Sequence, residues 1–200
     1  MILPRFRVVV FLLLCAWVVG AAEPPPAQKD PQSAYEPRGK PGAGQKFLEK
    51  FVGDWDVVKS FHPQTGDPVR ATGDCKQTMI NDGRFLRSEF VFRQGDATTT
   101  GLGLIGFEPD TGTFTSVWAD SRQTRMSFRQ SEGKFNGEEI VLHGKSLEGG
   151  KEGRRSRTVT RLEDDGRKIV HRQFTEGRDG KERLVMELVL TRKKEAPAGK

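Results

Sequence analysis

The sequence predicts an all-β fold, a single up-and-down antiparallel barrel of about ten strands with a short helix before the first strand. Apolar and polar residues alternate over most of the chain after residue 44, as in strands with one wet face. Turn signals rich in glycine, aspartate and asparagine recur at short intervals between these segments. A meander of this length leaves two open edges unless it closes on itself, and closure produces a barrel.

Residues 1–22 are typical of a secretory signal peptide. Arg5 and Arg7 precede an unbroken apolar run at residues 8–19, and small residues follow at positions 20–22. The run is too short for a membrane span, so we expect none after the signal is removed. The expected location is exported, either periplasmic or extracellular. Removal deletes two arginines and no acidic residue, which leaves the mature chain modestly basic, two charges below the full chain's +6.

The rest of the chain divides into a leader, one domain and a tail. Residues 23–43 are rich in proline and poor in branched apolar residues, which predicts a disordered leader. Residues 44–193 have the length of one ordinary domain, and residues 194–200 are expected to be a disordered tail. Cys75 is the only cysteine after position 22, so no intramolecular disulfide can form and a packed core must stabilise the fold.

The elements can be taken in order along the domain. A short helix is expected over residues 44–51, followed by strands in which one face is consistently apolar. In the segment at residues 88–93, for example, every second residue belongs to the apolar face. The predicted inward positions are Trp55, Val57, Leu86, Ser88, Phe90, Phe92, Phe114, Ser116, Trp118, Met126, Phe128, Thr158, Thr160, Leu184, Met186, Leu188 and Leu190.

The stretch FVGDWDVVKS, at residues 51–60, opens the first strand. A glycine here allows two backbones to approach closely, and a tryptophan provides enough apolar area to fill the base of a barrel. Gly53, Asp54 and Trp55 match the glycine-any-tryptophan signature of lipocalin-like, or calycin, barrels. We therefore expect Trp55 to form the floor of the barrel.

A closer resemblance extends over the whole domain. Its most specific pieces are the run at residues 83–86, the spaced glycines Gly101, Gly103 and Gly106, and the run at residues 118–120. Together with the opening stretch they resemble the bacterial family called domain of unknown function 1579, a calycin-like group, over residues 44–193. This resemblance implies the barrel and leaves the activity open.

The apolar face of the strands carries a few hydroxyl groups, and an acidic residue follows at one strand end. An apolar cavity with a few convergent polar groups is typical of small-molecule sites, so we predict that the barrel binds a small apolar molecule. The predicted ligand-binding residues are Arg84, Ser88, Phe90, Phe114, Ser116, Trp118, Asp120 and Met126.

Three other functions stay open at this point. An enzyme could use Asp120 at the cavity mouth as an acid or base, provided that the carboxyl is desolvated and unpaired. If Asp120 is paired, Arg84 is a natural partner, and the carboxylate can also cap the turn at residues 119–124. A barrel filled by its own side chains would be a structural protein of the cell envelope.

The remaining function is haem binding, because the same superfamily includes haem-binding barrels similar to nitrobindin. Of the three histidines only His171 lies in the middle of a predicted strand, and the alternation does not decide which face it occupies. The chain contains no recognisable catalytic, phosphate-binding or metal-spacing motif, so we expect no metal site. The basic run at residues 151–157 alternates like a wet strand face, which argues against nucleic-acid binding. The protein is expected to be a monomer or a homodimer.

Overall fold

The computed structural model describes residues 31–36, 39–148, 151–177 and 179–194. The chain forms two compact units, residues 1–38 and residues 39–200. In the first unit, residues 31–36 form turns in which the backbone amides of Tyr35 and Glu36 donate to the carbonyl of Gln32. The expected signal peptide, most of the expected leader and residues 195–200 of the expected tail lie outside the described residues.

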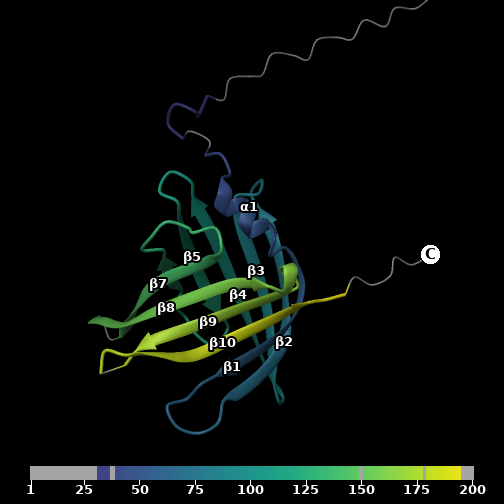
Figure 1. Cartoon of the computed structure of the whole chain (residues 1–200), viewed down its shortest axis with the longest axis vertical. Helices are drawn as coiled ribbons and strands as arrows, with labels where there is room; N and C mark the ends of the chain where they lie inside the picture. The colour runs from purple at the N-terminus through teal and green to yellow at the C-terminus, as the bar shows by residue number, and fades with distance from the viewer. Residues whose placement is uncertain (1–30, 37–38, 149–150, 178, 195–200) are drawn as a thin grey trace, which may run out of the picture. The chain divides into compact units, whose positions relative to one another are not determined.

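The second unit is a closed antiparallel barrel of ten strands, which confirms the predicted fold (Figure 1). Each strand pairs with its neighbours in the sequence, and β10 pairs with β1 to close the sheet. The short helix α1 (Ala43–Glu49) precedes the first strand, and a single 3-10 turn, η1 (Asp164–Gly166), separates β8 from β9. The strands are β1 (Gly53–Phe61), β2 (Val69–Ile80), β3 (Phe85–Gln94), β4 (Ala97–Glu108), β5 (Thr113–Asp120), β6 (Ser127–Gln130), β7 (Glu139–Glu148), β8 (Lys151–Glu163), β9 (Lys168–Glu176) and β10 (Glu182–Arg192).

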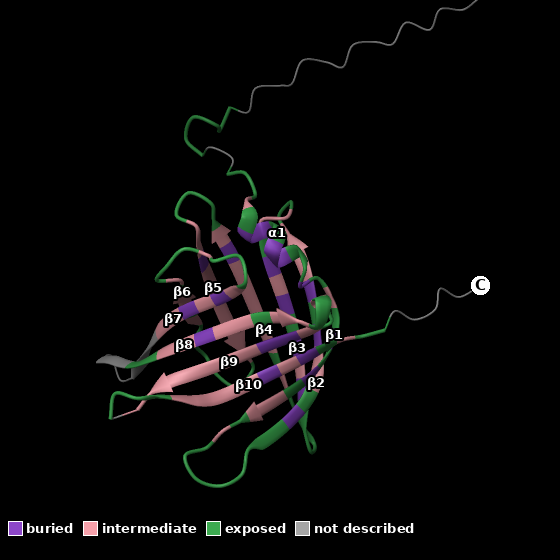
Figure 2. Ribbon diagram, viewed as in Figure 1, coloured by how far each residue is buried: buried purple, intermediate pink, exposed green. Residues whose placement is uncertain are grey.

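Helix α1 closes one end of the barrel, where β2 and β4 end and β3 begins. The side chain of Gln45 accepts a hydrogen bond from the Gly42 amide at 2.7 Å and donates one to the Phe107 carbonyl on β4, also at 2.7 Å. The apolar side chains Phe47 and Leu48 of the helix are buried in the core. Figure 2 shows buried positions in α1 and at alternate places along several strands. We call this the closed end of the barrel.

Trp55 lies at the closed end, as its position in the sequence predicts. Its side chain is fully buried, and its Nε1 donates a hydrogen bond to the Phe51 carbonyl at 3.0 Å. The guanidinium of Arg192 lies 4.1 Å from the centroid of the Trp55 ring system and donates to the carbonyls of Lys50, Val52 and Gly166. Arg192 therefore ties the last strand to the segment that enters the first.

Gly53 is required by this arrangement for two reasons. Its φ of +142° lies in a region that L side chains rarely adopt. A Cβ at this position would also overlap the Arg192 guanidinium. The glycine and the tryptophan of the opening stretch thus serve one purpose, since the first leaves room for the arginine that covers the second.

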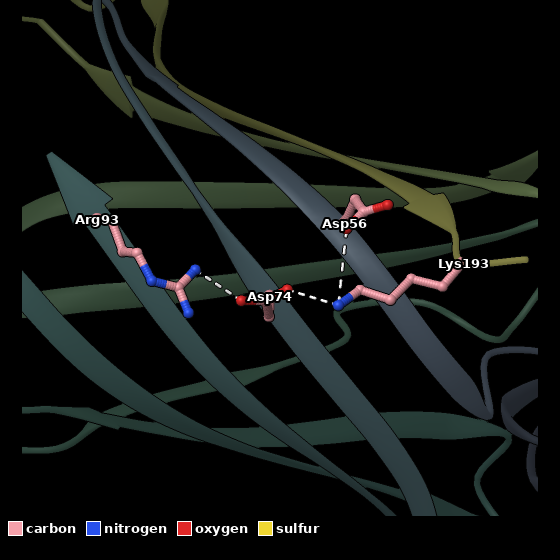
Figure 3. Close-up of polar contacts among 4 residues, drawn as sticks. All are labelled: Asp56, Asp74, Arg93 and Lys193. Carbon is pink, nitrogen blue, oxygen red and sulfur yellow. Dashed lines mark hydrogen bonds and ion pairs between the residues drawn. The ribbon is translucent and has the colours of Figure 1, made fainter. Parts of the chain in front are cut away.

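The outer face of the barrel carries charged pairs between neighbouring strands. The Asp74 carboxylate on β2 accepts hydrogen bonds from Lys193 Nζ and from Arg93 Nη1 on β3, each at 2.6 Å (Figure 3). Lys193 also lies 3.6 Å from Asp56 on β1. The hydrogen bonds from Lys193 and Arg93 lower the pKa of Asp74. Pairs of this kind contribute little stability in water, so the buried interior must hold the fold together.

In two places the predicted strand faces are wrong. Met126 precedes β6 and is 71% exposed, and Phe128 in β6 is 60% exposed, whereas Ser127 and Arg129 face the interior. Within the described residues β6 pairs with β7 at only one position, so this short strand places an apolar side chain outward without the usual burial. In β10 a bulge between Leu184 and Met186 turns Val185 inward as well.

Candidate functional site

The interior of the barrel is hollow, which removes the filled-barrel alternative. A cavity of about 780 Å³ extends from the core to the end opposite α1, where the partly exposed Phe61 and Val69 line it. We call this end the mouth. Its main apolar lining residues are Leu86, Phe90, Phe92, Ile105, Trp118, Ile140, Leu142, Ile169, Met186, Leu188 and Leu190. Its polar lining residues are Lys59, Gln77, Ser88, Gln94, Ser116, Asp120, Arg122, Gln123, Arg125, Ser127, Arg129, Thr158, Thr160, His171 and Gln173.

One side of the cavity is aromatic. The rings of Phe90 and Phe92 stack with centroids 5.3 Å apart, and Trp118 meets Phe90 edge to face at 5.4 Å. Gly101 on β4 lies directly under the indole of Trp118, and a Cβ there would overlap the ring. One of the spaced glycines of β4 therefore leaves the space that the tryptophan occupies. This arrangement provides a rigid apolar surface for a ligand.

Asp120 holds Trp118 in place at the mouth. Its Oδ2 accepts a hydrogen bond from Trp118 Nε1 at 2.9 Å, and its Oδ1 accepts one from the Arg122 amide at 2.8 Å. The second bond is the turn cap that the sequence suggests. Because both oxygens are engaged, Asp120 does not meet the condition of an unpaired carboxyl on which the enzymatic alternative depends.

The opposite side of the cavity is polar. His171 on β9 faces inward beside Thr160 on β8, and its Nδ1 lies 2.7 Å from the Thr160 hydroxyl. The structure thus decides the face that the sequence leaves open. Burial, with a smaller contribution from the positive charge of Arg129, lowers the pKa of His171 to about 4. The imidazole is therefore neutral at pH 7.

Arg129 on β6 is the charged group deepest in this polar side, and sequence analysis misses it. It lies across from Ser116 on β5, and its Nε is buried without a hydrogen-bond partner among the described residues. Burial lowers the pKa of its guanidinium. The buried Oε1 of Gln77 also lacks a partner in the described part of the chain. The alternation would reveal Arg129 only if Phe128 were assigned to the outer face.

Lys59 is the second cation that sequence analysis misses, and it lies near the mouth. Its ammonium lies 4.2 Å from the ring centroid of Phe92 and 4.7 Å from that of Phe61. Burial lowers the pKa of Lys59, the charge of Asp120 opposes this change, and the charge of Arg122 adds to it. The mouth thus combines aromatic rings with positive charge.

Five of the eight predicted ligand-binding residues line the cavity together. They come from two strands, β3 and β5, whose inward positions the alternation identifies, and they are Ser88, Phe90, Ser116, Trp118 and Asp120. The other three do not line it. Met126 is the exposed residue before β6, for the reason given above.

Phe114 and Arg84 lie toward the closed end instead. Phe114 is buried and packs against Phe107 and Phe135, with ring centroids 4.8 and 5.0 Å away. Arg84 donates to the carbonyls of Gly39 and Asn81 at the turn before β3.

The strand register separates Arg84 from Asp120. Phe85, next to Arg84, pairs with Gly106, whereas Asp120 pairs with Gly101, five residues closer to the mouth on the same strand β4. The sequence places both charged residues at strand ends, but these are opposite ends of the barrel. Arg84 is therefore not the partner of Asp120.

Two further features bear on the kind of site. Among the described residues, no group of three or more histidine, cysteine, aspartate or glutamate side chains is arranged to hold a metal ion. No helix in the described part of the chain has the length and apolar character needed to cross a membrane. Cys75 is buried, and burial raises the pKa of its thiol to about 12, so the thiol stays protonated at neutral pH.

The fold and the one-ended cavity define a hollow calycin-like barrel. The chain belongs to the family described as protein of unknown function (DUF1579), whose model matches residues 40–192. A search of curated proteins finds no match.

Two solved structures share the fold. The structure of Rv2717c from M. tuberculosis is 14% identical, with a TM-score of 0.56, and the match covers 78% of this chain and 100% of that one. The S-type phycobiliprotein lyase CPES from Guillardia theta is 12% identical, with a TM-score of 0.53, and the match covers 76% of this chain and 94% of that one. At these identities the likeness concerns the fold alone.

Proposed function

We propose that this protein is a binding module that holds a small, largely apolar molecule in the barrel cavity. The observation that carries the proposal is the cavity itself, about 780 Å³ in volume, with stacked aromatic rings on one side and hydrogen-bonding groups on the other. Rigid aromatic side chains give contact area at little entropic cost, and a few polar groups fix a ligand's orientation. The fold is shared with a phycobiliprotein lyase, and that likeness is compatible with a small-molecule ligand.

A direct test uses a neutral fluorescent probe, N-phenyl-1-naphthylamine, whose emission rises in an apolar site. We expect saturable binding to the wild type, and Trp118→Ala should weaken it by about 1 to 3 kcal/mol through lost contact area. The matched control is Phe128→Ala, which removes an aromatic side chain that is 60% exposed on the outer face of the neighbouring strand. Equal affinities in the two variants, or no binding to the wild type, would contradict the proposal.

Haem is a second candidate ligand, because His171 presents a neutral imidazole to the cavity. Its Nδ1 is engaged with Thr160, and its Nε2 has no hydrogen-bond partner in the part of the chain that is described. A neutral imidazole nitrogen is the usual axial ligand of haem iron. Native mass spectrometry of protein purified from its own host discriminates the candidates. A retained haem, with a Soret band that His171→Asn abolishes, would favour the second.

We also propose that the protein is exported and acts outside the cytoplasm. The charged start, apolar run and small-residue exit of residues 1–22 support this location. A binding module in the periplasm or outside the cell would meet its ligand there without competition from cytoplasmic proteins.

A further inference from the structure

The positive charge of Arg129 has no counterpart within the cavity. No acidic residue in the described ranges forms an ion pair with it, and its Nε is shielded from solvent without an acceptor. A buried cation is costly unless an anion compensates it, and arginine keeps its charge even when burial lowers its pKa. The folded protein therefore contains an unsatisfied site for a negative group.

The other charges around the cavity do not supply this group. The only carboxylate that lines it is Asp120, and both of its oxygens accept hydrogen bonds from Trp118 and from the Arg122 amide. Lys59, Arg122 and Arg125 also line the cavity and are cationic. The lining thus has an excess of positive charge, which attracts anions and repels cations.

The register gives the anion site a definite depth. Arg129 lies across from Ser116, two residues closer to the closed end than Trp118, which lies across from Ser127. A molecule whose acidic group reaches Arg129 therefore extends its remaining length past the indole of Trp118 toward the mouth. A carboxylate fits the planar fork of a guanidinium, and the apolar remainder fits the aromatic side of the cavity.

From this geometry we propose that the ligand is an amphipathic carboxylic acid, with its carboxylate paired to Arg129 and its apolar part against Phe90 and Trp118. The inference rests on the proposed binding function and specifies the chemical class of the ligand. His171 lies close enough for the charge of Arg129 to act on its ring, so its free Nε2 provides a further hydrogen-bonding position for the same acidic group.

The experiment compares two probes that differ only in charge, 11-(dansylamino)undecanoic acid and its primary amide, at pH 7. Wild type should bind the acid at least about tenfold more tightly than the amide, because only the acid compensates Arg129. Arg129→Met keeps the length of the side chain and removes the charge, so it should abolish the preference while leaving amide binding within about threefold. Lys76→Met, which removes one positive charge from the exposed outer face of β2, should retain the preference.

The outcomes separate this inference from the proposed function. Equal binding of acid and amide to the wild type would overturn the anion site and leave the binding function standing. Binding of neither probe would count against both. A preference lost in Lys59→Met but kept in Arg129→Met would place the acidic group at the mouth and contradict the deep site. If Arg129→Met does not fold, the wild-type comparison and Arg129→Lys, which should keep part of the preference, decide the question.

Discussion

The buried histidine gives this barrel a specific sensitivity to acid. His171 is neutral in the folded protein because burial and the charge of Arg129 hold its pKa at about 4, against an ordinary value of 6.5. In the unfolded chain the same imidazole takes up a proton as the pH falls through 6.5. Between pH 6.5 and pH 4 the unfolded state therefore binds more protons, so the folding stability that depends on His171 decreases as the pH falls.

The size of this effect follows from the difference in pKa. Each pH unit between the two values removes about 1.4 kcal/mol, so folding should lose about 3 kcal/mol between pH 7 and pH 4 because of this one group. His171→Asn removes the titrating ring and retains a polar atom near the Thr160 hydroxyl. The variant should lack this loss, whereas outer ion pairs such as Arg172 with Glu187 titrate in both proteins and cancel in the comparison.

Urea unfolding of both proteins at several values between pH 4 and pH 7 measures the difference in stability. NMR titration of the His171 ring protons measures the folded pKa directly. The reasoning is refuted if the ring titrates near 6.5, or if the difference in stability between the two proteins changes by less than about 0.5 kcal/mol across this range. Either result would mean that water or a structural change solvates the imidazole in the folded state.

Two further predictions concern the floor of the barrel and the chain's start. Trp55→Ala should cost about 3 to 5 kcal/mol in denaturant melts, because it leaves a void among buried residues and removes the ring that Arg192 covers, whereas Val58→Ala on the outer face of the same strand should cost less than about 1 kcal/mol. Similar costs would show that Trp55 does not fill the floor. Amino-terminal sequencing of the mature protein should begin near Glu23, and an intact Met1 in a cytoplasmic fraction would rule out export.

The sequence was sufficient to predict the fold because its main signals are local. A period of two reports which side chains share a face of one strand, and turn residues report where that strand ends. These signals identified the ten-strand meander and the inward positions of Phe90, Ser116 and Trp118. They failed in β6, where the strand is short and Phe128 is exposed, and at the bulge in β10, because neither irregularity leaves a mark on the alternation.

Tertiary structure alone decided how the strands face one another across the barrel. Closure and register place Arg84 and Asp120 at opposite ends, bring Arg129 near His171, and turn His171 toward the cavity. Whether the interior is filled or hollow depends on the diameter of the closed sheet and on the summed volume of side chains from every strand. Eight strands leave an interior that side chains can just fill, and the ten strands here enclose more. The alternation within any one strand contains no information on that balance.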